Sequence, residues 1–249
     1  MLNAFLIGLL AASSLLIGCL IALAHQVRPR TLAAIIAFGV GVLISAVAYD
    51  LVADSFQVSG GRGITLGLLC GSLTFFLGDL FIDRAGGANR KSMTGDGGGS
   101  GGESSGRAIV LGTVLDGIPE SMVLGLSLLS GEGVSLTMLA AVFLSNLPEA
   151  MAATSGLRTS GQPPRKTIRM WTLVVLVSAL ASAVGYALLD GAGPAAIAFV
   201  QSFAAGAILT MLVDTMVPEA FEHGGRMVGL ITTLGFAVAF GLASLEVLA

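Results

Sequence analysis

Two segments near the middle of the chain carry the same pattern of acids and prolines within apolar sequence. They read Leu115-Asp116-Gly117-Ile118-Pro119-Glu120-Ser121-Met122 and Leu144-Ser145-Asn146-Leu147-Pro148-Glu149-Ala150-Met151. A charged side chain at the centre of a bilayer costs about 2.5 to 3.5 kcal/mol, and a proline frees a backbone carbonyl that another group must satisfy. Because both features recur on successive apolar segments, the sequence predicts a polar site inside a membrane.

The predicted site is rich in oxygen ligands. Its side chains are Asp116, Glu120, Ser145, Asn146 and Glu149. Within each segment the first ligand and the glutamate are four residues apart, so in a helix they share one face and can share a ligand. Each proline also leaves the carbonyl four residues earlier available as a further oxygen ligand. This combination is typical of a cation site.

The charge of this site requires compensation. Three charged carboxylates at this depth would together cost about 7 to 10 kcal/mol, and neither helix core contains a lysine or an arginine. A bound cation, bound protons or a water-filled path would each lower that cost. Our central hypothesis is a bound divalent metal. The structural alternative is a pair of kinked helices whose protonated acids hydrogen-bond across their interface.

The rest of the chain provides the membrane helices that must position these residues. Hydrophobic residues make up 55% of the sequence and charged residues only 11%, which excludes an ordinary soluble domain. The apolar runs are continuous and do not alternate, so the predicted fold is all-α and not a β-barrel. We predict eight transmembrane helices in a 3+2+3 arrangement, near residues 3–24, 31–56, 64–82, 108–130, 134–157, 168–189, 194–221 and 227–248.

Basic residues predict the orientation. Eleven of the twelve lie on the side reached after odd-numbered helices, and only Arg62 lies on the other. Short loops rich in Lys and Arg stay cytoplasmic, so we predict an integral plasma (inner) membrane protein with both termini extracytoplasmic. The long connection 83–106 is rich in Gly and Ser and is predicted to be a flexible cytoplasmic loop within one transmembrane domain, 1–249.

An internal repeat relates the second and seventh predicted helices. A shift of 165 residues aligns Phe38, Gly41, Val52, Asp54, Phe56 and Gly60 with Phe203, Gly206, Val217, Glu219, Phe221 and Gly225. Five of these pairs are identical and the remaining pair keeps its carboxylate. Since the two helices cross in opposite directions, the sequence predicts inverted repeats, the plan of many carriers with a site at the membrane midplane.

Further polar residues on these two helices suggest a pathway to the central site. The candidates are Asp50 and Asp54 at the outer end of the second helix, and Asp214, Glu219, Glu222 and His223 on the seventh. We expect Asp214 and Glu219 to be the more buried of these. Carboxylates at the mouth, centre and exit would attract cations and pass them on. For the other four, the alternative is an ordinary interfacial residue that faces water.

The two Pro-Glu segments resemble the fourth and fifth helices of the ZIP (zinc/iron permease) family of divalent-metal transporters, whose usual pattern is His-Asn-x-Pro-Glu-Gly. Tyr49-Asp50-Leu51-Val52-Ala53-Asp54 and Asp214-Thr215-Met216-Val217-Pro218-Glu219-Ala220 are similar to the family's second and seventh helices. The resemblance covers nearly the whole chain. It implies transport of zinc, iron or manganese toward the cytoplasm.

The chain departs from the family at the ligands themselves. Asp116 and Ser145 stand where the family has histidines, and Gly117 replaces an asparagine that Asn146 retains. No acid lies between Thr167 and Leu189, where some members supply a ligand to a second metal, so a two-metal centre is not expected. Oxygen ligands suit manganese, magnesium or ferrous iron at least as well as zinc.

Two other function classes remain open from the sequence. One is a proton- or sodium-coupled carrier of a small organic solute, and the other is a transport-inactive scaffold or metal sensor. We expect no enzymatic activity and no permanently bound cofactor, because the metal is the transported substrate. The expected partners are the lipid bilayer and the metal ion; the glycine-rich helix surfaces permit a homodimer, and no nucleic acid is expected.

Overall fold

The structure, a computed structural model, describes residues 1–59, 61–84, 103–129 and 135–248, and its regular elements in these ranges are all helices. The predicted all-α fold is therefore confirmed. The elements are α1 (Leu2–Ala24), α2 (Pro29–Ala46), η1 (Val47–Ala53), α3 (Asp54–Ser59), α4 (Gly61–Ile82), α5 (Glu103–Ser127), α6 (Leu136–Thr159), α7 (Pro164–Leu189), α8 (Pro194–Met211), η3 (Leu212–Met216), α9 (Val217–Gly224) and α10 (Met227–Leu248). The two η elements are π-helical.

Proline and glycine define several of these boundaries. Proline is the first residue of α2, α7 and α8, a position where its missing N–H leaves no hydrogen bond unmade. Gly161, Gly191 and Gly225 have positive φ angles of 78°, 80° and 56° and lie in the turns that follow α6, α7 and α9. Glycine tolerates this backbone conformation, so the chain can reverse direction sharply after each helix.

Seven helical segments within the described ranges are long and apolar enough to cross a membrane. Two of them are composite rods, α2–η1–α3 over Pro29–Val58 and α8–η3–α9 over Pro194–Gly224. The helix that carries the first Pro-Glu pair, α5, has 25 residues but is not among the seven. Transmembrane helices are therefore confirmed, while the eight-helix 3+2+3 arrangement stays a prediction.

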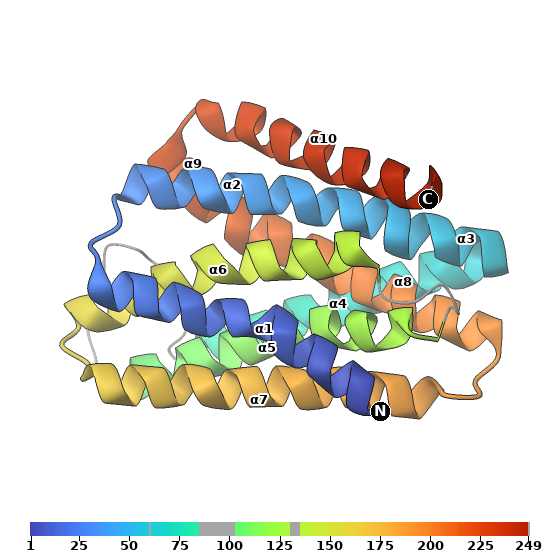
Figure 1. The fold of residues 1–249 in the computed structure, drawn as a ribbon, viewed down its shortest axis with the longest axis horizontal. Helices are drawn as coiled ribbons and strands as arrows, with labels where there is room; N and C mark the ends of the chain where they lie inside the picture. Colours follow the sequence, from blue (N-terminus) through green and yellow to red (C-terminus); the bar gives the residue numbers. More distant parts are fainter. Residues whose placement is uncertain (60, 85–102, 130–134, 249) are drawn as a thin grey trace.

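The helices form one bundle with their axes roughly along its length (Figure 1). The links α1–α2, α6–α7 and α9–α10 lie at one end, on the left, and both chain termini lie toward the other end. Arg28 and Arg226 belong to two of these links and Arg165 is the second residue of α7, so all three belong to segments at the same end of the bundle. That grouping is the one the basic residues predict, although which end faces the cytoplasm stays a prediction. Most of the predicted loop 83–106 lies outside the described residues.

The two composite rods share a feature that the sequence does not reveal. η1 begins at Val47 and η3 begins at Leu212, which reproduces the 165-residue offset of the sequence repeat. The neighbours of the rods also correspond, because α2 lies against α10 and α8 lies against α4. In the same way α1 lies against α6 and α7 lies against α5. These paired features support the predicted inverted repeat.

Glycines set the close approach of the rods to their neighbours. A Cβ atom at Gly41 of α2 would collide with the carbonyl oxygen of Thr232 in α10. A Cβ atom at Gly206 of α8, the repeat partner of Gly41, would collide with the carbonyl oxygen of Leu68 in α4. Small residues at such positions let helix backbones pack tightly in a membrane. These two contacts explain why both copies of the repeat have a glycine at this position.

Candidate metal site

The first half of the candidate site lies on α5. The side chains of Asp116 and Glu120 are each only 2% exposed. Pro119 lies inside the helix without ending it. The main neighbour of α5 is α7, and α5 also contacts α1, α4, α6 and α8. The packing of these helices places two carboxylates of one helical turn in the interior of the bundle, as predicted.

The second half lies on α6, where Pro148 is also inside a continuous helix. Ser145 is 1% exposed and Asn146 is 6% exposed, whereas Glu149 is only half-buried. The Ser145 hydroxyl donates a hydrogen bond to the carbonyl oxygen of Val142, 3.0 Å away within the same helix. The hydroxyl oxygen keeps lone pairs as an acceptor or metal ligand, but its proton is committed to the backbone.

The carbonyl released by the second proline faces another helix. A Cβ atom at Gly39 of α2 would lie 3.6 Å from the carbonyl oxygen of Leu144 and 3.5 Å from Cα of Ser145. Pro148 has no N–H to donate to the Leu144 carbonyl. The absence of a side chain at Gly39 thus leaves α2 in close contact with the helix surface beside the candidate ligands.

The five predicted ligands share the bundle interior but do not form a compact chelating group. α5 and α6 contact each other directly. Over the described ranges, however, no three His, Cys, Asp or Glu side chains come together as a metal-binding group. Asp116, Glu120 and Glu149 each take part in polar or electrostatic interactions with other residues. The structure therefore shows that α5 and α6 are neighbours and that Asp116 and Glu120 are buried, while metal binding by the five residues stays a prediction.

At the predicted outer end, Asp50 is tied to the beginning of α6. Its Oδ2 atom accepts a hydrogen bond of 2.7 Å from the hydroxyl of Ser135. The Ser135 oxygen in turn accepts a 3.0 Å hydrogen bond from the N–H of Met138, so Ser135 is the N-cap of α6. Asp50 is half-buried within η1, whereas Asp54, the first residue of α3, is exposed. Asp50 thus links the second predicted helix to the Pro-Glu helix α6.

One burial prediction is wrong. Asp214 is exposed, although the sequence predicts it to be among the more buried acids of its helix. It lies within η3, beside the exposed Val213. A π-helical turn holds more residues than an α-helical turn, so it rotates side chains away from the faces that an α-helical pattern assigns to them. Glu219, in α9, is half-buried.

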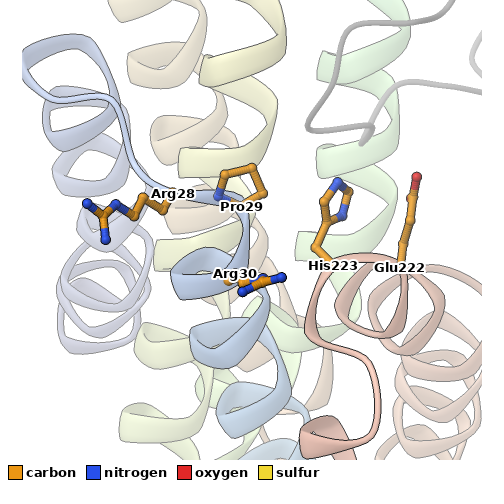
Figure 2. Close-up of a pocket in the computed structure, with 5 residues that line it drawn as sticks. All are labelled: Arg28, Pro29, Arg30, Glu222 and His223. Carbon is orange, nitrogen blue, oxygen red and sulfur yellow. The ribbon is translucent and has the colours of Figure 1, made fainter.

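Glu222 and His223 line a pocket of about 570 Å³ at the end of the bundle that holds the α1–α2 link. Figure 2 shows both side chains rising from the end of α9, with Arg30 reaching toward them from the start of α2 and Arg28 on the other side of Pro29. In the sequence, these arginines indicate only the orientation of the chain. Their position beside two predicted pathway residues cannot be read from spacing, since 192 residues separate Arg30 from Glu222.

Together these features define an all-helical integral membrane protein with carboxylates buried among its membrane-spanning helices. The sequence is similar to that of an Arabidopsis thaliana protein named as a candidate zinc transporter, with 24% identity over 211 residues. The match covers 84% of this chain and 32% of the relative, so the chain spans about a third of that protein's length. No protein-family model matches the chain. The match confirms the resemblance to a zinc-transporter family that the Pro-Glu segments suggested.

Proposed function

We propose that this protein transports divalent metal cations across a membrane through a site formed by α5 and α6. The observation that carries the proposal is the burial of Asp116 and Glu120, each 2% exposed, on a helix in contact with a second Pro-Glu helix. Buried carboxylates within a membrane are costly unless a cation or protons offset their charge. The similarity to a protein named as a candidate zinc transporter favours a metal cation.

The proposed ligands are Asp116, Glu120, Ser145, Asn146 and Glu149. All five would donate through oxygen, and the family resemblance makes zinc, manganese and ferrous iron the candidate substrates for such a donor set. Zinc is the substrate in the name of the relative, whereas carboxylate and hydroxyl ligands are those that harder ions prefer. We treat the metal as substrate and propose no resident cofactor.

The proposed mechanism moves one group of helices against another. α6 lies mainly against α1 and α5 lies mainly against α7, so these four helices make up one group. In the other group, α2 pairs with α10 and α8 pairs with α4. Sliding between these two groups would expose the midplane site to one side and then to the other, as repeat-based carriers do. Asp50, Asp54 and Glu219 are proposed to lead ions to and from the site. The proposed direction is toward the cytoplasm, with both termini outside.

Uptake by purified protein in proteoliposomes tests this function. We would load a metal-sensitive dye inside the vesicles and add zinc, manganese or ferrous iron outside. Wild-type protein is expected to admit at least one of these ions, whereas Glu120→Ala and Glu149→Ala, tested separately, should admit it far more slowly. Asp190→Asn, at an exposed position that follows α7, is the matched control. Unchanged uptake in both well-folded glutamate variants would sink the proposal.

A further inference from the structure

The pocket beside Arg30 continues into a second cavity of about 500 Å³. Arg30, Glu222 and His223 line both cavities. Beyond them, the walls of the second cavity become apolar, with Ala34 on α2 and Val228 and Ile231 on α10. One end of the combined space is therefore charged, and the other is a groove between two membrane helices.

The charged end favours an anion over a metal ion. Arg28 and Arg30 carry two positive charges against the single carboxylate of Glu222, and His223 adds no negative charge. The two helix ends at this place oppose each other, because α2 begins at Pro29 and α9 ends at Gly224, so the sign of the charge is decided by the arginines. A divalent cation would be repelled here, whereas a guanidinium binds a phosphate through two parallel hydrogen bonds.

The apolar groove narrows the choice of anion. A free phosphate would use only the charged end, whereas a phospholipid carries both a phosphate for the charged end and an acyl chain for the apolar groove. The basic residues predict that this end of the bundle faces the cytoplasm, where membranes carry anionic lipids. We propose that the combined pocket binds an anionic phospholipid, with the phosphate at Arg30 and an acyl chain between α2 and α10. The lipid site rests on the predicted orientation and not on metal transport.

Native mass spectrometry of the purified full chain tests this lipid site. Dioleoyl phosphatidylglycerol and dioleoyl phosphatidylcholine would be added separately to wild-type protein and to Arg30→Gln. Wild-type protein is expected to retain the anionic lipid about fivefold better than the zwitterionic lipid, and Arg30→Gln should lose that preference. Arg165→Gln is the matched control, since Pro164-Arg165 occupies the same place at the start of α7 but lines neither cavity.

Two further measurements distinguish a bound lipid from a bound free anion and from a folding defect. Ala34→Leu fills the groove and keeps both arginines, so it should lower lipid retention even if Arg30→Gln folds poorly. Inorganic phosphate in large excess should leave the lipid bound. Equal lipid retention by wild type, Arg30→Gln and Ala34→Leu would overturn the proposal, as would equal losses in Arg30→Gln and Arg165→Gln. Displacement by inorganic phosphate would also overturn it and would identify a site for free anions.

Discussion

The two Pro-Glu helices carry the same motif in different surroundings. On α5, both acidic members of the motif are almost fully buried, and the main neighbour of the helix is α7. On α6, the first member is a serine whose proton is bonded to its own helix, and Glu149 is half-buried. The main neighbours of α6 are α1 and α2. The motif thus gives two unequal halves. In the proposed site, α5 would contribute most of the negative charge, and α6 would contribute mainly neutral oxygen ligands and one more accessible carboxylate.

The largest expected effect comes from neutralising one glutamate at a time, either Glu120 on α5 or Glu149 on α6. Glu120→Gln should weaken metal uptake about a hundredfold and Glu149→Gln about tenfold, because the more buried carboxylate contributes more to binding a cation. Initial uptake rates in proteoliposomes over a range of metal concentrations would measure both. A larger loss of uptake in Glu149→Gln than in Glu120→Gln would contradict the proposed difference between the two helices.

A second expected effect concerns metal preference. Asp116→His and Ser145→His each add an imidazole, a ligand that suits zinc better than manganese. Because Asp116→His also removes a hard carboxylate ligand, it should raise the zinc-to-manganese uptake ratio more than Ser145→His does, by about tenfold against about threefold. Competition assays with both metals present would give these ratios. Equal ratios in wild type and both variants would place the two residues outside the ligand set.

A third, smaller effect concerns the close contacts of α5 with α7 and of α6 with α1. A Cβ atom at Gly125 of α5 would collide with the carbonyl oxygen of Ser182 in α7, and one at Gly18 of α1 would collide with that of Leu147 in α6. Gly125→Ala and Gly18→Ala should each destabilise the fold by about 1–3 kcal/mol.

Thermal unfolding in detergent would measure this packing effect. Gly39→Ala is the matched control, since its Cβ atom would meet neighbouring atoms only at 3.5 Å or more. A loss of stability in the control equal to that of Gly18→Ala would show that helix contact is not the cause.

The smallest expected effect lies at the beginning of α6. Ser135→Ala removes both the N-cap and the hydrogen bond to Asp50, and should cost about 1 kcal/mol of stability. Asp50→Asn keeps an acceptor for Ser135 and should cost less. If Asp50 also guides ions, Asp50→Asn will lower uptake at low metal concentration while Ser135→Ala will not. Equal uptake by the two variants would assign Asp50 a purely structural role.

The sequence predicts the membrane helices well because long apolar runs are a direct physical requirement of a bilayer. It also predicts the burial of Asp116, Glu120, Ser145 and Asn146, since each lies mid-helix on a repeated motif. It fails at Asp214, because hydrophobic pattern does not reveal where a helix becomes π-helical.

Contacts between distant segments are the other part that the sequence cannot reveal. Nothing in the spacing of Arg30 and Glu222 indicates that α9 ends beside the start of α2. The repeat is readable from identical residues at a fixed offset, whereas the close approach of Gly41 to α10 depends on packing that only three dimensions display. The burial and spacing of the candidate ligands are therefore easier to predict from the sequence than which helices pack against each other.

Equilibrium metal binding by the purified protein tests the central claim most directly. Wild-type protein and the double variant Glu120→Gln/Glu149→Gln would be dialysed against zinc and, separately, manganese, and the bound metal would be counted by mass spectrometry. We predict that wild-type protein retains a bound divalent ion and that the folded double variant retains none above the level of a metal-free control. Equal retention by the two proteins would contradict a metal site between α5 and α6.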